Sequence, residues 1–379
     1  MAKKLRVGVL FGGKSAEHEI SLLSAKNIVE AMDKEKYEVV LIGINKSGEW
    51  FLHADLANCL LNADNAKLIQ LTKAQENVTL VAKEKGNPLV NLSGGCSSEA
   101  PLDVIFPVLH GTYGEDGTMQ GLLKLANIPF VGAGVLASAV GMDKDVMKRL
   151  LRDAGIPIAK FLTVHSHEKH LIDFEKITET VGLPFFVKPA NLGSSVGISK
   201  VKNKAEFEEK IDFAFQFDHK VLIEENVTGR EIECSVLGNE NPIASLPGEV
   251  IPQHEFYSYE AKYLDENGAL FEIPAKLVEK EVREIQALVI RAYQVLCCEG
   301  MARVDVFLTP DGRVILNEIN TIPGFTRISM YPKMWESSGL SYQNLIDRLI
   351  ALALQKYEKE QKLKTTVALM QSPRAVDGL

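Results

Sequence analysis

The sequence has few cysteines, no long apolar run and no excess of positive charge. Its five cysteines are odd in number and form no C-x-x-C pair, which argues against a disulfide framework or a cysteine-bound metal and favours a reducing compartment, the cytoplasm. No window approaches about 18 consecutive apolar residues, so we expect no membrane span. The apolar run near the start turns polar too soon for a secretory signal. The net charge of −8 argues against nucleic acid or an anionic membrane as a partner.

What the sequence does contain is an alternation of strand and helix patterns. An apolar run at residues 5–11 is followed by a glycine-containing loop, a segment with apolar residues at helical spacing (19–32) and a second apolar run (37–45). This order predicts the start of an open parallel α/β sheet, to which residues 102–111 add another strand. Residues 62–100 are polar and weakly periodic, and we interpret them as surface elaboration.

A second region begins near residue 143 and mixes helices with short strands. We expect helices at 143–154, 206–217, 279–296 and 342–360, and strands at 184–190, 196–201, 220–227 and 230–238. The last residues, from about 365, have no pattern, and we expect a loose tail. There is no internal repeat or low-complexity tract, and the length of 379 residues favours two or three domains.

The segment 301–320 combines two apolar strands with four polar residues that interrupt them. The D-G dipeptide in "TPDGR" predicts a two-residue turn between the strands. Counting outward from that turn gives the pairs Arg303–Asn320 and Asp305–Glu318 and, on the opposite face, Val304–Ile319 and Leu308–Ile315. Because side chains alternate faces with period two, the four polar residues share one face. A bulge at Pro310 would shift this pairing by one residue.

This shared polar face has two interpretations. Two carboxylates and an amide about 5 Å apart are difficult to keep ionised without a counter-charge. Mg²⁺ would supply it, because this ion prefers oxygen ligands and often shares them with nucleotide phosphates. The alternative is a surface salt bridge between Arg303 and the acidic residues. The residues alone leave both interpretations open.

Two glycine-containing loops are candidates for phosphate binding. Residues 191–195, "NLGSS", join two strands, and their backbone N–H groups would wrap phosphate oxygens beside Lys188, although a flexible turn explains the same residues. Residues 8–15, "GVLFGGKS", match the P-loop pattern G-x-x-x-x-G-K-[ST]. However, residues 9–11 continue the apolar strand and leave only two glycines to turn the chain, which argues against a P-loop.

Three further candidates lie in loops. Glu17 stands at the start of a predicted helix, where the helix dipole favours a carboxylate, so it either caps the helix or holds a ligand ammonium group. His110 ends a strand at the edge where open α/β sheets bind ligands, or it is a hydrogen-bonded structural histidine. Residues 251–268 are long, polar and aromatic, which is typical of a lid, and Lys262 and Tyr263 are its candidates to reach a substrate.

Taken together, these segments resemble the D-alanine–D-alanine ligase family of the ATP-grasp superfamily. The matching stretches, in family order, are "FGGKSAEHEIS", "HGTYGEDGTMQG", "MDKDVMKRLL", "FVKPANLGSSVG", "VLIEENVTGREIE", "EAKYLDENG", "ARVDVFL" and "NEINTIPGF". The resemblance extends from about residue 5 to residue 357. It implies an α/β fold, in part α+β, with a three-domain ATP-grasp architecture that begins with an open parallel sheet domain. The implied domains are 1–125, 126–216 and 217–358, followed by a disordered tail at 359–379, with ATP held between the central and C-terminal domains.

The resemblance also implies roles for three groups of residues. Two Mg²⁺ ions, for which Mn²⁺ could substitute, would be held by Asp305, Glu318 and Asn320. ATP would be contacted by Lys144, Lys188, Gly193, Ser195, Val196, Glu224, Glu225, Val227, Glu231 and Lys262. The two D-alanines and the reaction centre would involve Glu17, His110, Ser194, Tyr263, Arg303, Gly324 and Ser329. Among these, Glu17 would bind the first D-alanine's ammonium, linked to Ser194 and Tyr263.

The implied reaction is the ATP-dependent ligation of two D-alanines through an acylphosphate, for peptidoglycan precursor synthesis. Arg303 and the Gly324 N–H would stabilise the oxyanion of the second step. Family members that make D-alanyl-D-lactate usually lack a tyrosine at the lid position, so Tyr263 points to the dipeptide ligase. The resemblance also implies a cytoplasmic homodimer. Two alternatives are a P-loop phosphotransferase built on residues 8–15 and a non-catalytic amino-acid or nucleotide sensor.

Overall fold

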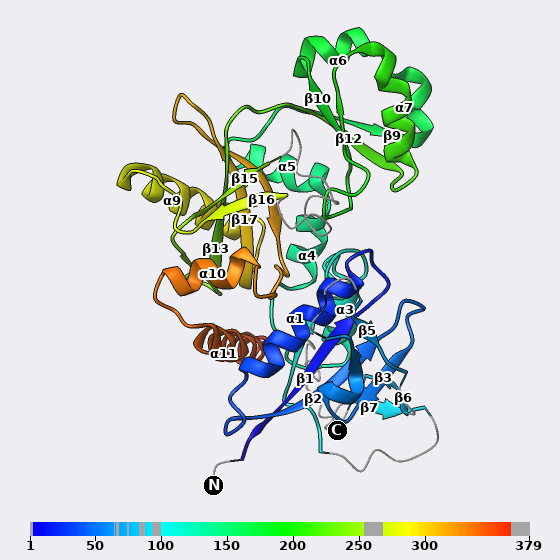
Figure 1. Cartoon of the computed structure of the whole chain (residues 1–379), viewed down its shortest axis with the longest axis vertical. Coiled ribbons are helices and arrows are strands. Elements are labelled where there is room, and N and C mark those ends of the chain that lie inside the picture. Colours follow the sequence, from blue (N-terminus) through cyan, green and yellow to red (C-terminus); the bar gives the residue numbers. More distant parts are fainter. Residues whose placement is uncertain are drawn as a thin grey trace, which may run out of the picture.

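The structure is a computed structural model that describes residues 3–63, 65, 68–73, 76–82, 88–92, 100–253 and 268–364. Three large β-sheets with their covering helices occupy different parts of the molecule, and the helices α4 (Val135–Met142) and α5 (Lys144–Asp153) lie between them (Figure 1). Within these residues, no helix combines the length and apolar character needed to cross a membrane.

The N-terminal sheet has the strand order β7-β6-β3-β2-β1-β8. The elements of this part are β1 (Leu5–Gly12), α1 (His18–Ala31), β2 (Tyr37–Ile44), β3 (Trp50–His53), α2 (Leu56–Cys59), the small pair β4 (Leu60–Leu61) and β5 (Gln70–Leu71), β6 (Glu76–Leu80), β7 (Leu89–Asn91), β8 (Val104–Val108) and α3 (Thr118–Leu125). β1 pairs in parallel with β2 and β8, but β3, β6 and β7 are antiparallel. The prediction of an open parallel sheet is therefore wrong for half of this mixed sheet. Two of its strands, β6 and β7, come from residues 62–100, whose weak pattern indicates only surface elaboration.

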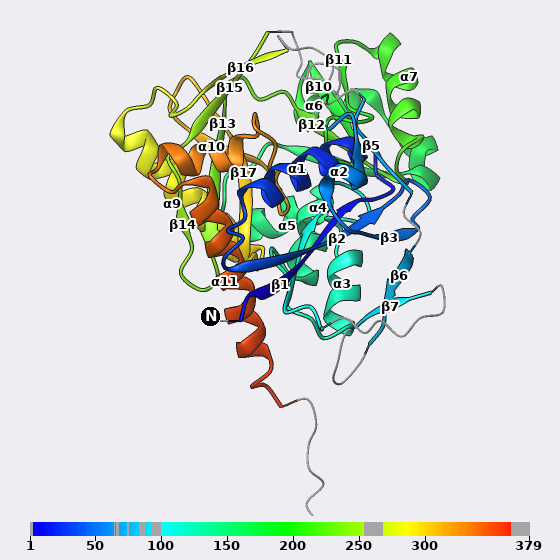
Figure 2. The same cartoon turned by 60° about the horizontal axis from the view of Figure 1, so that its bottom comes forward.

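β1 is buried on both faces because helices cover both sides of the sheet. Val7, Val9 and Phe11 pack in one core with α1 and with α11 (Tyr342–Glu360), whereas Leu10 packs in a second core with α3. Figure 2 shows α11, the last helix, lying close to the N-terminal sheet. Helix α11 therefore helps to hold strand β1 in position.

Residues 8–12 of the segment that matches the P-loop pattern belong to β1. Residues 8–12 pair with β2, and the chain then turns at Gly12 and Gly13, whose φ angles of 93° and 95° favour glycine. The exposed Lys14 lies with its Nζ 5.6 Å from the ring centre of Tyr113. The expectation that residues 9–11 continue the strand is confirmed.

The central sheet has the order β11-β10-β12-β9. Its elements are β9 (Phe161–His165), the 3₁₀ helix η1 (Ser166–Leu171), α6 (Phe174–Val181), β10 (Phe185–Pro189), β11 (Ser199–Val201), α7 (Lys204–Phe215) and β12 (Lys220–Glu225). All pairs are antiparallel, and β12 lies between β10 and β9. A boundary between residues 216 and 217 would separate β12 from its own sheet, so we now propose that this domain ends after residue 225.

The C-terminal sheet has the order β16-β15-β13-β17-β18, with β14 paired to β13. Its elements are β13 (Arg230–Gly238), β14 (Ile243–Ala244), β15 (Gly248–Pro252), β16 (Ala269–Glu272), α9 (Glu279–Val295), β17 (Gly300–Leu308), β18 (Val314–Asn320), α10 (Met330–Ser337) and α11. Met147 and Leu151 of α5 share a core with this sheet and with α9. This packing holds α5, the helix that precedes the central sheet, against β17 and β18, which carry the polar face.

The hairpin of β17 and β18 differs in one respect from its predicted pairing. Arg303 lies opposite Asn320 and Asp305 opposite Glu318, as predicted, but Leu308 lies opposite Val314 instead of Ile315. Thr309 N–H donates to the carbonyl oxygen of Arg313, which leaves three residues in the turn, and the register then shifts between Asp305 and Val306. The bulge restores the predicted register at the polar face.

Candidate active site

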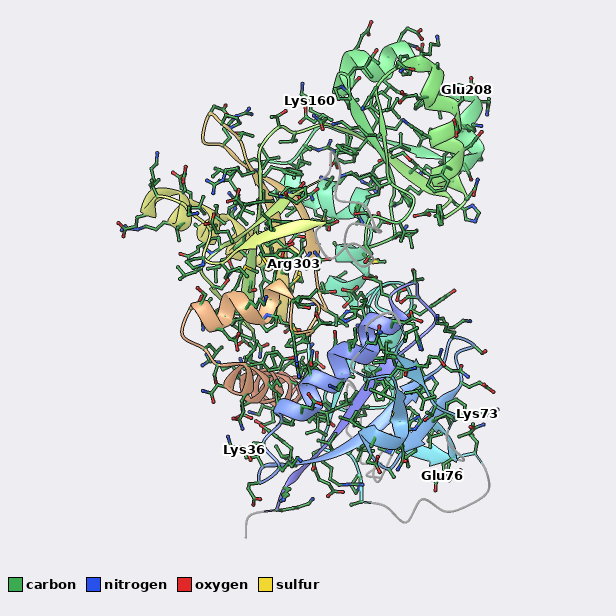
Figure 3. All side chains as sticks on the ribbon, viewed as in Figure 1. Lys36, Lys73, Glu76, Lys160, Glu208 and Arg303 are labelled. Carbon is green, nitrogen blue, oxygen red and sulfur yellow. The ribbon has the colours of Figure 1, made fainter. Side chains whose placement is uncertain are left out.

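The polar face of β17 and β18 includes an acidic residue of β13. Glu233 lies opposite Asp305 across β13 and β17, and Asp305 lies opposite Glu318 across β17 and β18. Three carboxylates therefore form a line across three neighbouring strands, about 5 Å from one strand to the next. Arg303 lies beside this line, opposite Asn320. Figure 3 places Arg303 near the middle of the molecule.

Arg303 makes the closest contacts in this group. Its Nε and Nη2 donate to the two oxygens of Asp305 at 2.8 and 2.7 Å, and its Nε lies 3.0 Å from Glu233 Oε2. Burial alone would lower the pKa of Arg303, but Asp305 and Glu233 raise it well above its ordinary value. The salt bridge that was the alternative interpretation is present, but it lies inside the protein, because the Arg303 side chain is only 21% exposed.

Asp305, Glu318 and Asn320 offer the oxygen ligands that Mg²⁺ prefers. Asn320 Nδ2 donates to Asp305 Oδ2 at 3.1 Å, and Lys144 Nζ lies 3.7 Å from Glu318 Oε2. In the described part of the chain, no three His, Cys, Asp or Glu side chains are arranged to hold a metal ion by themselves. Two carboxylates and one amide fit an ion that completes its coordination with phosphate and water oxygens.

The chain that follows β18 is held by a loop of the N-terminal part. Glu115 Oε1 accepts the Ile322 N–H at 3.1 Å, and Glu115 Oε2 accepts the Gly111 N–H at 2.7 Å. His110 Nδ1 lies 2.9 Å from the Ile322 carbonyl oxygen. Burial, followed by the charge of Glu17, raises the pKa of Glu115 to about 8. Both backbone polar groups of Ile322 are thus fixed by side chains that follow β8.

Ser24 of α1 completes this connection. Its Oγ accepts the Phe325 N–H at 3.1 Å and lies 3.2 Å from His110 Nε2. Because the Ile322 carbonyl only accepts, the hydrogen bonds assign the proton to His110 Nδ1, and Ser24 donates to Nε2. Burial lowers the pKa of His110, which favours this neutral form. His110 is thus observed as a hydrogen-bonded histidine that supports the segment after β18.

Gly324 lies between these anchored residues. Pro323 has no N–H, and the Gly324 N–H has no hydrogen-bond acceptor among the residues that the structure describes. A Cβ at position 324 would lie 2.8 Å from Ser329 Oγ, which itself accepts the Thr326 N–H at 2.9 Å. The Gly324 N–H is therefore both fixed in position and available to a bound molecule.

Glu17 is the N-cap residue of α1, but its side chain does not cap the helix. Its Oε1 accepts a hydrogen bond from Ser194 Oγ, in the loop between β10 and β11. A Cβ at Gly111 would lie 2.7 Å from Glu17 Oε2, and one at Gly193 would lie 3.4 Å from it. The Gly-rich loop of the central part thus meets Glu17 of the N-terminal part, in a space where two glycines leave room around the carboxylate.

A second charged cluster joins α5 to the central sheet. The buried Glu224 lies 2.9 Å from Lys148 Nζ and 2.6 Å from Lys188 Nζ. Burial alone would raise the pKa of Glu224, but the two ammonium groups lower it to about 2. Burial and the nearby charge of Lys188 lower the pKa of Lys148, although Glu224 and Glu318 oppose this shift. Lys144, one helical turn before Lys148, donates to the Leu192 carbonyl of the Gly-rich loop at 2.5 Å. The excess positive charge at this edge suits a phosphate group.

The other candidate residues are placed as follows. Glu225 Oε1 accepts the Lys160 N–H at 2.8 Å, and Val227 follows it in the half-buried connection to β13. Glu231 lies on β13 opposite Phe307. Val196 N–H donates to the Gly193 carbonyl at 3.1 Å, and Ser195 stands between them with a φ of 59°. Lys262 and Tyr263 lie outside the described residues.

Comparisons with known proteins agree with this geometry. The family model for the D-ala D-ala ligase N-terminus matches residues 6–133, and the model for the D-ala D-ala ligase C-terminus matches residues 150–351. The chain belongs to the D-alanine–D-alanine ligase family. A relative named D-alanine–D-alanine ligase from Oceanobacillus iheyensis is 55% identical over 96% of this chain and 99% of its own. D-alanine–D-alanine ligase A from Escherichia coli is 53% identical over 96% of this chain and 100% of its own.

Solved structures of ligases in this family share the fold. The D-alanine–D-alanine ligase from Coxiella burnetii is 40% identical, with a TM-score of 0.83 over 95% of this chain and 97% of its own. The VanG D-Ala:D-Ser ligase from Enterococcus faecalis is 34% identical, with a TM-score of 0.81 over 93% of this chain and 100% of its own. The multi-sheet architecture is therefore of the ATP-grasp type, with a mixed N-terminal sheet.

Four residues at the site of this ligase were not singled out from the sequence. They are Ser24, Glu115, Lys148 and Glu233. Two of them carried a signal. Lys148 follows Lys144 by one helical turn, which places both lysines on the same side of the helix, and Glu233 repeats the period-two spacing of acidic residues in "REIECS". Ser24 and Glu115 became recognisable only through their contacts with residues far away in the sequence.

Proposed function

We propose that the protein ligates two D-alanines in two chemical steps at the junction of its three sheets. Membership of the family makes it an ATP-dependent D-alanine–D-alanine ligase that serves peptidoglycan precursor synthesis. One observation supports a single site for both steps. The face of Arg303, Asp305, Glu318 and Asn320 is followed directly by the segment in which the Gly324 N–H is available.

In the first step, the first D-alanine's carboxylate attacks the γ-phosphorus of ATP, and an acylphosphate and ADP result. Lys144 and Lys188 would contact the phosphates, and residues 193–196 would cover them. Support comes from the cluster around Glu224, where the cations exceed the anions at the edge of the Gly-rich loop. Positively charged groups fixed around a transferring phosphoryl group stabilise the charge of its transition state. Glu224, Glu225, Val227 and Glu231 would face the adenine and ribose.

We propose that two Mg²⁺ ions, for which Mn²⁺ could substitute, would be held by Asp305, Glu318 and Asn320. When bound, the metal neutralises phosphate charge during phosphoryl transfer. The fit rests on the ligand set, which offers oxygen atoms and is too small to complete a metal's coordination without phosphate or water.

In the second step, the amine of the second D-alanine attacks the acyl carbon, and phosphate leaves. The carbonyl oxygen becomes an oxyanion, which the Arg303 guanidinium and the Gly324 N–H would stabilise. The Gly324 N–H is suited to this role because the groups on both sides of it are anchored before any substrate binds. Ser329, whose Oγ lies beside Gly324, would contact the second substrate.

Glu17 would bind the ammonium group of the first D-alanine, near His110. The hydrogen bond from Ser194 to Glu17 would close the Gly-rich loop over the substrate, which protects an acylphosphate from water. Tyr263 and Lys262 are proposed to add the lid's contacts. We also propose that the enzyme acts in the cytoplasm as a homodimer, and that its second substrate is D-alanine rather than the D-serine named for the related VanG ligase.

A pair of variants tests where ATP is used. Glu318→Gln removes a proposed metal ligand, whereas Lys14→Ala removes the lysine of the P-loop-like segment, which is exposed. We expect D-alanine-dependent phosphate release to fall by about 100-fold or more in the first variant and to stay within about twofold in the second. The reverse result would move ATP to residues 8–15.

A further inference from the structure

The line of three carboxylates across β13, β17 and β18 contains one more acid than the proposed metal site uses. Glu233 stands on β13, on the opposite side of Asp305 from Glu318. Its side chain is 13% exposed, and its Oε2 lies 3.0 Å from Arg303 Nε. A carboxylate this far inside the protein needs a compensating positive charge, and the Arg303 guanidinium supplies one.

Arg303 and a metal ion would compete for Asp305. A carboxylate has about four acceptor positions, and Asp305 already uses three, for Arg303 Nε, Arg303 Nη2 and Asn320 Nδ2. A divalent cation on Asp305 would repel a guanidinium that lies within 3 Å of the same oxygens. Without a second acceptor, metal binding would therefore drive Arg303 out of the position in which it meets the oxyanion.

The strand order gives Arg303 and the metal ion separate carboxylates on the two sides of Asp305. Glu318 lies on the β18 side of Asp305 and Glu233 on the β13 side, so the two charges have places on opposite sides. We propose that Glu233 is a positioning residue that keeps Arg303 on the β13 side, so that Asp305 can share a divalent cation with Glu318 while the guanidinium stays in the site. This inference rests on the proposed metal site and gives Glu233 a role in it.

The inference predicts that Glu233 and Arg303 are coupled in metal binding. Glu233→Gln keeps the shape of the side chain but removes its charge, so Arg303 would pair more firmly with Asp305 and exclude the cation. Arg303→Met removes the competitor, and metal binding would tighten. In the Arg303→Met background, Glu233→Gln would lose its effect because no guanidinium is left to hold.

The experiment measures Mn²⁺ affinity of the full chain with ADP and without D-alanine, by electron paramagnetic resonance or calorimetry. We expect Glu233→Gln to weaken Mn²⁺ binding by about tenfold or more, as expected for a lost charge-assisted contact. In the Arg303→Met background, the same change should alter affinity by no more than about twofold. Glu233→Asp should restore part of the affinity.

A matched control is Glu249→Gln in the same sheet. Glu249 is also buried and also pairs with an arginine, Arg230, whose Nε and Nη2 lie 2.9 and 2.6 Å from its oxygens. We expect this variant to keep Mn²⁺ affinity within about twofold of the original protein. An equal loss in both glutamate variants would overturn the inference, because the effect would then come from a general disturbance of the sheet.

Two further outcomes would contradict the role of Glu233. An equal loss with and without Arg303 would mean that Glu233 acts on the cation directly, and no loss in either background would mean that it has no part in metal binding. If the unchanged protein itself failed to bind Mn²⁺ with ADP, both the proposed metal site and the inference about Glu233 would be wrong. If the unchanged protein bound Mn²⁺ and released phosphate with D-alanine but showed no coupling, only the inference would fail.

Discussion

The connection between Glu115 and Ile322 gives the sharpest prediction about catalysis. Glu115 accepts two buried N–H groups, from Gly111 at 2.7 Å and from Ile322 at 3.1 Å. Glu115→Gln leaves one acceptor oxygen for these two donors, so one bond is lost, at a cost of about 1–3 kcal/mol. Ile322 stands two residues before Gly324, whose N–H we propose as an oxyanion donor. Complete loss of an oxyanion donor lowers the rate by about 10²–10³-fold. Because Glu115→Gln would only displace this donor, we expect kcat to fall by between about tenfold and about 10³-fold.

The assay separates this effect from a general loss of structure. We expect dipeptide formation to slow while the KM for ATP stays within about twofold, since the cluster around Glu224 is not changed. Asp116→Asn is the control, because Asp116 accepts the N–H groups of Tyr113 and Thr118 in the same loop, whereas the Ile322 N–H donates to Glu115. A Glu115→Gln enzyme with unchanged kcat, or a control with an equal loss, would refute the reasoning.

Stability should also depend on pH through Glu115. Its folded pKa is raised from 4.5 to about 8 by burial and by Glu17, against the opposing effect of two backbone hydrogen bonds and Arg303. The folded state therefore holds this proton more tightly than the unfolded state, and the associated stability is present below pH 4.5 and is lost as pH rises through 8. Urea unfolding at pH 6 and pH 8.5 should show the cost of Glu115→Gln shrinking at the higher pH. A cost that grows with pH would contradict this assignment.

Three other variants test the remaining contacts. Lys148→Met should destabilise the fold by up to about 3 kcal/mol in urea unfolding, because Glu224 stays buried with only one of its two cations, and it should weaken ATP binding; an unchanged midpoint would contradict the ion pair. Gly111→Ala should reduce kcat/KM for D-alanine by more than about tenfold and spare ATP binding, because its Cβ would lie 2.7 Å from Glu17 Oε2. Ser194→Ala removes one hydrogen bond to Glu17 and should lower kcat/KM for D-alanine about fivefold; equal activity would show that this contact does not close the loop.

Local patterns were enough to predict the polar face but not the path of the hairpin. The D-G dipeptide predicted a two-residue turn, whereas the turn has three residues and Asn317, between Leu316 and Glu318, is the extra residue of a bulge in β18. The two deviations cancel, so Asp305 meets Glu318 as predicted. The residue type at position 317 gives no sign of a bulge, so the sequence pattern could not predict this irregularity.

Two kinds of feature could not be predicted from the sequence, namely weakly patterned strands and contacts between residues far apart in the chain. The antiparallel strands β6 and β7 have weak patterns because few of their residues are buried; β7 is the edge strand of the N-terminal sheet and β6 lies next to it. Glu115 and Ile322 are 207 residues apart, so their hydrogen bond depends on how the first and last sheets pack. The eight family stretches, by contrast, are local, which is why the family and most of the candidate residues were accessible from the sequence.

The most direct test of the account is phosphate release from ATP and Mg²⁺, measured with D-alanine, other D- and L-amino acids and D-lactate in turn. We expect phosphate release with D-alanine together with one D-alanyl-D-alanine per phosphate, and a rate that rises towards alkaline pH because the attacking amine must be neutral. Phosphate release with another amino acid or with D-lactate, but none with D-alanine, would contradict it.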